Sequence, residues 1–411
     1  GGQDDFVFKL FSGVRDWNFK IDFENYPNTN HTIKYGVNYI YHKLTPNTAS
    51  ATTGDTQFNT TFLPKYANEA AVYILDDMKL GQKWALNTGL RISAFQQVGP
   101  YTSKLDGQEF GNFEPVKTYT GFEPRFSINY KATNDFSIKS GVAWTNQYLH
   151  LVSNSSSTLP ADVWVPSTEI VKPQTGVQYA LGFFKNFSND TYETSIEVYY
   201  KDLKNQIDYA DDYVNDINQE VEDAFVFGKG RAYGAEFFLK KAKGKFNGWI
   251  GYTLSRSERS FDKIEGGRWY PAVYDRPHDL SVVVNYKPFK KWDFGAVFIY
   301  GSGKLFTPVR GFFFVEQNIN LFYGPRNSSR LDAYHRLDLS ATYTPRPDSK
   351  RKYQGSWTFS VYNTYNRKNP FFVNFDTNTD FQTGTTTIEG TKITIFPLIP
   401  SITYNFKWNQ K

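Results

Sequence analysis

The chain has 411 residues, 18% of them aromatic, and its 46 basic residues nearly balance its 41 acidic ones, which leaves a net charge of +5. This near-equality of basic and acidic residues argues against a nucleic-acid-binding protein. The absence of cysteine excludes a disulfide scaffold or a thiolate metal site. No run of about 18 apolar residues occurs, so no transmembrane helix is expected. A membrane β-barrel is compatible with the mean hydropathy of -0.54, because every second residue of such a barrel faces water.

The first residues, Gly1 to Asp5, lack the basic start and apolar core of a signal peptide. We therefore expect a mature exported protein or a fragment of one, and the strand count below favours a fragment. Further along, apolar residues recur at every second position, the period of a β-strand with one apolar and one polar face. Such strands are expected around 14–26, 33–41, 84–93, 192–200, 280–286, 292–300, 336–343, 357–366 and 402–408, with no convincing amphipathic helix between them.

The connections between these segments alternate between two lengths. Short ones are expected near 27–30, 80–83, 132–135, 188–190, 243–245, 289–291 and 346–355, and long ones near 45–65, 98–117, 149–172, 206–229, 259–273, 303–330 and 368–391. Short turns at one end and long loops at the other are typical of bacterial outer-membrane barrels, whose long loops lie outside the cell. A soluble β-sandwich has no such asymmetry. The sequence therefore predicts an all-β fold, a transmembrane antiparallel β-barrel in a bacterial outer membrane, with residues 1–411 as one portion of a single barrel domain.

The faces of the terminal strands follow from the same alternation. Lipid is expected to cover the apolar face, and the polar face is expected to line the lumen. On this basis Trp17, Phe19, Ile21, Ile402, Tyr404 and Phe406 face lipid, whereas Lys20, Asp22, Asn405 and Lys407 face the lumen.

The strand count has a consequence for closure of the barrel. About fifteen strands are expected, so the first and the last run in the same direction. Barrels of this type close with an even number of strands, and we therefore expect an odd number of strands before residue 1, unless another element fills the seam. Seven more would give 22, the size of the plugged outer-membrane transporters.

Local segments along the whole chain resemble the barrel of TonB-dependent outer-membrane receptors of the Bacteroidetes type. Each segment is weak alone, and their order is the stronger signal. They are 12–17 (SGVRDW), 69–73 (EAAVY), 112–115 (NFEP), 122–125 (FEPR), 164–168 (WVPST), 234–237 (GAEF), 274–279 (YDRPHD), 334–338 (YHRLD), 362–372 (YNTYNRKNPFF) and 396–401 (FPLIPS).

The resemblance implies a 22-stranded barrel filled by an N-terminal plug, of which this chain is the C-terminal part without the plug. It also implies that the TonB complex of the inner membrane supplies the energy for transport by pulling on a short N-terminal sequence box on the plug. TonB binding is therefore expected through the missing N-terminal region. Barrel assembly machinery is expected to read a final strand that closes on an aromatic residue. The signal would be Ile402, Tyr404, Phe406 and Trp408, although Asn409 to Lys411 follow, where the family usually ends on the aromatic.

Three patterns that could suggest enzyme, metal or phosphate chemistry have simpler explanations. Tyr274–Asp279 gathers acidic, basic and histidine side chains, but we interpret it as the start of a strand with inward ion pairs. Gly301–Lys304 lacks the spacing of a phosphate-binding loop. No metal, cofactor or catalytic residue is therefore expected, since the histidines also lack ligand spacing: His31, His42, His150, His278 and His335.

The long loops are where a ligand would bind, and one of them combines arginines with aromatic residues. Aromatic rings stack on ligand rings, and arginine binds carboxylate or phosphate with two hydrogen bonds. The alternative is that the phenylalanines pack against another loop or a partner protein. The candidate residues are Arg310, Phe312, Phe313, Phe314, Tyr323 and Arg326.

The sequence thus predicts a receptor that imports a nutrient ligand through a plugged barrel. The alternative is a barrel of the same fold that serves as a structural or partner-binding subunit of a larger outer-membrane complex, and a surface lipoprotein is a candidate partner in either case. A barrel enzyme is a remote third class. Iron chelates, cobalamin, glycans and peptides are all compatible with the loops, and nothing in the sequence chooses among them.

Overall fold

The structure is a computed structural model that describes residues 6–53, 56–60, 64–152, 163–210, 221–315, 318–348, 353–380 and 385–408. One large sheet of 17 strands dominates it. Within the described ranges the helices are two short 3-10 turns, η1 (Val221–Ala224) and η2 (Glu265–Gly267). None of the described helices is long and apolar enough to cross a membrane.

Fifteen of the seventeen strands are long, and the two short ones are β3 (Thr56–Thr60) and β16 (Tyr270–Pro271). Their alternating apolar residues are the sequence signal described above. The long strands are β1 (Phe6–Asn28), β2 (His31–Thr53), β4 (Lys65–Leu80), β5 (Trp84–Val98), β8 (Pro115–Lys131), β9 (Phe136–Gln147), β12 (Gln174–Phe187), β13 (Tyr192–Tyr209), β14 (Phe225–Lys241), β15 (Phe246–Ser260), β17 (His278–Phe289), β18 (Trp292–Gly301), β23 (Tyr334–Tyr343), β24 (Tyr353–Tyr362) and β27 (Ile399–Trp408).

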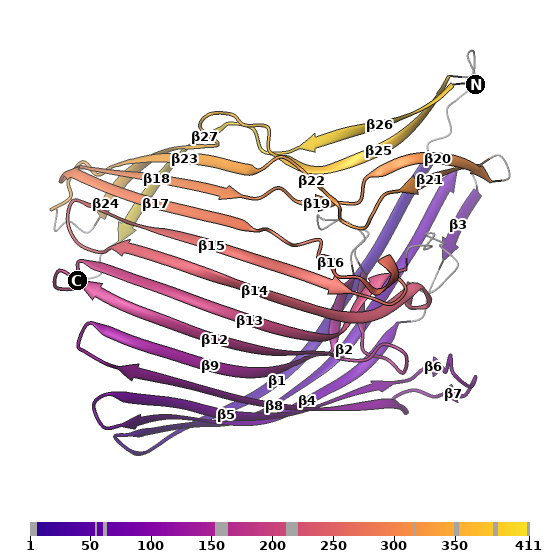
Figure 1. Ribbon diagram of the computed structural model, residues 1–411, viewed down its shortest axis with the longest axis horizontal. Helices are drawn as coiled ribbons and strands as arrows, with labels where there is room; N and C mark the ends of the chain where they lie inside the picture. The colour runs from indigo at the N-terminus through magenta and orange to yellow at the C-terminus, as the bar shows by residue number, and fades with distance from the viewer. Residues whose placement is uncertain are drawn as a thin grey trace.

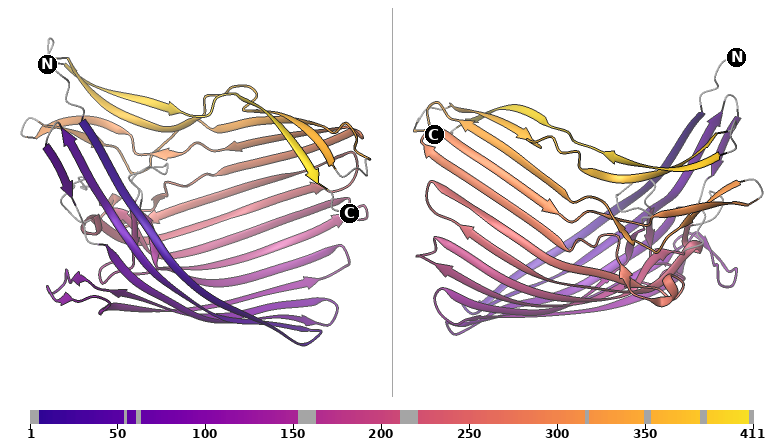
Figure 2. Two further views of the ribbon diagram at one scale, coloured as in Figure 1. Left: turned by 180° about the vertical axis from the view of Figure 1, so that it is seen from behind. Right: turned by 45° about the horizontal axis from the view of Figure 1, so that its top comes forward.

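Each long strand pairs antiparallel with the next long strand, so the sheet is an up-and-down meander from β1 to β27. The sheet curves into an open trough with β1 and β27 at its edges (Figure 2). No pairing joins these two strands in the described part of the chain. Because the number of long strands is odd, β1 and β27 run in the same direction, as the sequence predicts.

The two ends of the trough differ in their connections (Figure 1). One, the short-turn end, carries tight hairpins such as 81–83 and 132–135. The other, the long-loop end, carries connections that contain small sheets of their own. These sheets pair β6 (Tyr101–Thr102) with β7 (Glu109–Phe110), β10 (Leu149–Val152) with β11 (Val163–Pro166), β19 (Leu305–Phe306) with β22 (Ser329–Arg330), β20 (Val309–Val315) with β21 (Asn318–Tyr323), and β25 (Pro370–Asp380) with β26 (Thr385–Thr394).

Two of the expected long loops are wrong in their bounds, because strands continue through them. β2 runs to Thr53 and stays paired with β1 as far as Phe6, and β3 then pairs with the end of β2. Similarly, β13 continues to Tyr209 and β14 begins at Phe225, so both ends of the expected 206–229 loop are strand. Backbone hydrogen bonding needs no apolar side chains, so the end of β2 shows no alternation. The end of β13 does alternate, with Ile207 and Tyr209 alternating with polar residues, but the run is too short to separate from a loop.

The pairing of β24 with β27 displays the two faces of the sheet, because directly paired residues project from the same side. Trp357 pairs with Tyr404 and Tyr353 pairs with Trp408, with ring centroids 4.8 and 4.5 Å apart. The predicted separation of an aromatic face from a polar face is therefore confirmed here. On the polar face, Ser360 Oγ lies 2.7 Å from Ser401 Oγ, and Asn405 donates to Thr358 at 3.4 Å.

The polar face is the inner face of the trough, because the connection after β9 folds onto it. Tyr119 donates its hydroxyl to the carbonyl of Thr168 (2.7 Å), and the Gln97 side chain accepts the backbone N–H of Glu169 (2.9 Å). Ser167 and Thr168 are fully buried there. The connection therefore covers the inner wall formed by β5 and β8.

A row of charged side chains lines this inner wall, and its members form ion pairs with one another. The buried His42 lies between Asp16 (2.8 Å) and Glu69 (3.5 Å). Arg91 lies 3.5 Å from Glu69 and 3.9 Å from Glu123. These contacts join β1, β2, β4, β5 and β8, which gives the row a structural role.

Candidate ligand-binding cavity

A cavity of about 1190 Å³ opens at the long-loop end, between the connections that follow β9, β13, β15, β18 and β24. It is larger than the common range for small-ligand pockets, roughly 300–1,000 Å³. Aromatic side chains reach it from four of these connections: Trp164, Tyr274, Phe306, Phe313, Phe322, Tyr323, Phe372 and Phe375.

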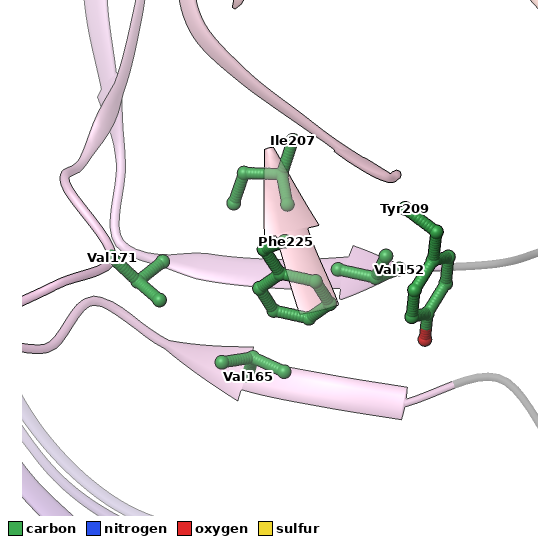
Figure 3. Packing of buried hydrophobic residues seen from close by; sticks show 6 residues of the cluster. All are labelled: Val152, Val165, Val171, Ile207, Tyr209 and Phe225. Atoms are coloured by element: carbon green, nitrogen blue, oxygen red, sulfur yellow. The ribbon is translucent and has the colours of Figure 1, made fainter. Parts of the chain in front are cut away.

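A cluster of buried aliphatic and aromatic side chains (Figure 3) lies beside this cavity and shares residues with its lining. Ile207 and Val152 belong both to this cluster and to the cavity lining. They come from β13 and β10, so the cluster fixes the long connection after β9 against the sheet. The cluster consists of Val152, Val165, Val171, Ile207, Tyr209 and Phe225.

The structure divides the six predicted ligand residues into two groups. The β20–β21 hairpin alternates its faces, and Phe313 lies on the face that includes Phe322. Phe312 and Phe314 contact each other edge to face, with centroids 5.7 Å apart, and do not line the cavity. The cavity therefore collects four of the predicted residues, namely Arg310, Phe313, Tyr323 and Arg326.

Arg310 occupies a β-bulge at the base of this hairpin. The register shifts between Val309 and Gly311, so Arg310 has no residue opposite it, and a bulge re-aims its side chain. The side chain lies against Gly324, where an added Cβ would be 2.9 Å from Arg310 Nε. Arg310 is exposed and has no hydrogen-bond or ion-pair partner among the described residues. Its positive charge is therefore available to a ligand in the cavity.

Arg326 is held by the protein itself. Its guanidinium lies 2.5 Å from Asp208 Oδ1, and its backbone N–H donates to Glu265 at 2.7 Å. Asp208 also accepts the Tyr270 hydroxyl at 3.3 Å, and burial together with this negative charge raises the pKa of Tyr270. Arg326 thus positions its loop, and its charge is paired with Asp208, which also lies 3.8 Å from Arg259.

The motif at Tyr274–Asp279 is a structural lock at the edge of the cavity. Asp275 is buried and accepts the backbone N–H of Ser257 (2.7 Å) and the guanidinium of Arg330 (2.8 Å). Arg330 also donates to the carbonyl of Gly303 at 2.7 Å. The lock joins the connection after β15 to the one after β18, in line with the inward ion pairs expected from the sequence.

Gly301–Lys304 also has a structural explanation. A Cβ added at Gly303 would lie 1.7 Å from the carbonyl oxygen of Leu331, so only glycine permits this approach of two backbones. Burial, with a contribution from nearby Arg276, lowers the pKa of Lys304, whose Nζ lies 4.4 Å from the Phe371 ring. The described residues include no cluster of three His, Asp or Glu side chains that could hold a metal.

Sequence reasoning missed most of the aromatic lining. Phe322 is 60% exposed and shares the cavity face with Phe313, and the alternation of β21 could have indicated it. Trp164, Phe306 and Phe375 come from three separate connections, and no local pattern could have shown that they meet.

An antiparallel meander with one apolar face, short turns at one end and a loop-enclosed cavity at the other defines the class of outer-membrane β-barrels. The chain belongs to the family described as "TonB dependent receptor-like, beta-barrel", which matches residues 2–399. This family consists of outer-membrane barrel proteins. No curated protein is similar enough in sequence to count as a match.

Solved structures agree in fold at low sequence identity. The FrpB iron transporter from Neisseria meningitidis (F3-3 variant) is 11% identical, with a TM-score of 0.59 over 96% of this chain and 55% of that one. The ferric-catecholate import receptor Fiu from K12 E. coli is 13% identical, with a TM-score of 0.57 over 97% and 55%. The copper transporter OprC is 11% identical, with a TM-score of 0.58 over 87% and 53%. The chain thus spans about half the length of these proteins.

Proposed function

We propose that the chain is the C-terminal part of a TonB-dependent receptor of the Bacteroidetes type, which imports a nutrient ligand across the outer membrane. In this proposal the fifteen long strands belong to a plugged 22-strand barrel, and the long loops are extracellular. The plug and the TonB contact lie in the remainder of the receptor. Family membership and the matching fold support the proposal.

The observation that carries import is the cavity with its unpaired Arg310. The exposed rings of Phe313, Phe322 and Tyr323 line the same cavity as Arg310, whose positive charge has no acidic partner among the described residues. A partner-binding scaffold has no need for an aromatic cavity behind its loops. Such a site fits a ligand with a planar or apolar portion and a carboxylate, phosphate or other anionic group.

Growth of a strain that carries only a variant receptor tests this proposal. The variant Arg310→Ala/Phe313→Ala removes the charge and one ring from the cavity face. We expect at least tenfold weaker growth when the imported nutrient class, whether iron chelate, cobalamin, glycan or peptide, is the sole source. Unchanged growth on all four classes, at normal receptor abundance in isolated outer membranes, would overturn import through this cavity.

The second candidate function, binding of a partner such as a surface lipoprotein, is favoured by the opposite face of the same hairpin. Phe314 is 61% exposed and does not line the cavity. The variant Phe312→Ala/Phe314→Ala is therefore the matched control for the cavity variant. Loss of a co-purifying protein from this variant, with growth unchanged, would assign the outer face to a partner.

A further inference from the structure

An apolar groove of about 400 Å³ lies on the outer face of the sheet, across β9 and β12–β15. Its walls are mostly half-exposed apolar side chains of the lipid-facing rows, and the lining also contains Lys185, which pairs with Asp135. Thr194 lies between Lys185 and Leu239 in one of these rows. Its side chain is shorter than those of its neighbours, so the surface is recessed at this position. The walls include Phe183, Ile196, Phe237, Leu239 and Ile250.

The groove approaches the short-turn end, where lysines are concentrated. Four of the six residues from 240 to 245 are lysine, and the adjacent turn contains Lys287, Lys290 and Lys291. The two turns are neighbours, because the backbone N–H of Lys287 donates to the carbonyl of Lys245 at 2.7 Å.

Only some of these lysines have an acidic partner. Ion pairs join Lys185 to Asp135, Lys240 to Glu193, Lys287 to Asp293 and Lys290 to Asp348. Within the described residues, Lys241, Lys243, Lys245 and Lys291 have none. Asp190 in the neighbouring turn accepts from Asn186 and could offset one charge at most. The short-turn end beside the groove therefore carries an excess of positive charge.

Two of the unpaired lysines lie directly beyond the groove. Lys241 pairs with Gly248, in the lipid-facing register of Leu239 and Ile250, and its Nζ lies 5.6 Å from the Phe246 ring. Gly248 presents no side chain opposite Lys241, because the backbone of β17 lies so close that an added Cβ would be 2.1 Å from the Val283 carbonyl oxygen. Lys243 donates to the Asn189 carbonyl of the next turn. Tyr192, which pairs with Lys241 and is exposed, is of the amphipathic aromatic type enriched at the headgroup level of a bilayer, and it places this region there.

We propose that this groove binds one acyl chain of an anionic glycerophospholipid, whose phosphate is held by Lys241 and Lys243. The proposal rests on the membrane placement given under Proposed function, and it is independent of ligand import. A protein segment is the less suitable occupant, because the groove lies within the band that lipid covers. The excess positive charge selects a lipid with net negative charge over a zwitterionic one.

Native mass spectrometry of the full-length receptor, with phosphatidylglycerol or phosphatidylcholine added at increasing concentration, tests the site. We expect the wild type to retain phosphatidylglycerol preferentially. Lys241→Gln/Lys243→Gln should weaken that retention about tenfold or more, and Thr194→Trp should weaken retention of both lipids by filling the groove. Lys240→Gln is the matched control, because its side chain projects from the opposite face and pairs with Glu193.

Several results would overturn the site. These are equal retention of the two lipids by the wild type, wild-type retention by the double lysine variant, or an equal loss in Lys240→Gln. A co-purifying protein that shields the groove would also do so. Heat-modifiable gel migration establishes that each variant is folded. The lipid-retention measurement and the growth assay on nutrients are independent of each other. A failure of this lipid site can therefore be distinguished from a failure of the proposed import.

Discussion

At the scale of single residues, two arginines of one loop show that an ion-pair partner decides whether an arginine is available to a ligand. Arg310 and Arg326 both line the cavity, but Arg326 is bound to Asp208, whereas Arg310 is exposed. The sequence predicts both as ligand residues, because their type and loop are the same. The neutralising carboxylate of Asp208 belongs to β13, more than a hundred residues away, and no local pattern indicates it.

His150 predicts a pH dependence of the connection that covers the inner wall. It lies on β10, is buried, and contacts Ser167 Oγ at 3.1 Å. Burial lowers its pKa from 6.5 to about 4, so the folded connection holds the neutral ring while an unfolded one binds a proton below pH 6.5. The stability that the neutral His150 ring contributes to the folded connection is therefore complete above pH 6.5. As the pH falls from 6.5 towards 4, the connection loses about 3 kcal/mol of this stability.

Hydrogen exchange of β10 and β11, corrected for intrinsic rates, measures this loss. Protection should fall between pH 6.5 and 4 in the wild type, and His150→Phe should remove the dependence. An identical pH dependence in the variant would assign the effect to other groups.

The buried Asp275 allows a prediction about the lock that joins the connection after β15 to the connection after β18. Asp275→Ala leaves the guanidinium of Arg330 without its buried partner, and breaking such a pair costs about 3–5 kcal/mol. We expect faster protease cleavage within 302–333 while the sheet stays intact. Arg268→Ala, which removes an exposed pair with Glu265, is the control and should change little.

At the scale of strands, the alternation of β27 predicts where charge is tolerated. An arginine at Ile402, on the aromatic face, should cost about 2–4 kcal/mol near the bilayer midplane, and an arginine at Thr403 much less. Denaturant unfolding of the receptor in bilayers measures the difference. Equal costs would mean that the faces are assigned incorrectly, because a shift of one residue exchanges them.

The same strand predicts an effect on assembly. Trp408→Ala should lower receptor abundance in isolated outer membranes, because burial of an aromatic side chain contributes roughly 1.5–3 kcal/mol and the resemblance assigns this residue to the assembly signal. Lys407→Ala, on the polar face, is the control. Asn409–Lys411 lie outside the described residues, and their deletion should leave abundance unchanged or slightly raised. Harm from Lys407→Ala alone would contradict the prediction.

The strand scale also shows how far sequence reasoning reaches. Alternation located the strands that have one apolar face, such as β1, β18 and β27. It failed for the end of β2, where residues 45–53 are mainly Thr, Ala, Ser and Asn and nothing distinguishes the two faces. The small sheet of β25 and β26 was missed for the same reason. Backbone pairing forms these elements, and it leaves no trace in side-chain type.

At the scale of the whole molecule, the unpaired edges predict that residues 1–411 alone do not form a closed barrel. β1 and β27 run in the same direction and do not pair in the described residues, and unpaired backbone groups in lipid cost several kcal/mol each. We expect this segment, expressed alone, to lack a compact, heat-modifiable form on gels. Such a form would show that the seam closes without further strands.

The β20–β21 hairpin has a consequence for the history of this surface. In β20, Phe313 lines the cavity, whereas its sequence neighbours Phe312 and Phe314 do not. Under the proposed import with extracellular loops, the ligand would constrain Phe313, whereas antibodies and phages would select on the residues outside the cavity. We therefore expect neighbouring codons to differ in how freely they change between strains: Phe313 should stay fixed, and Phe314 should vary unless a partner protein binds it.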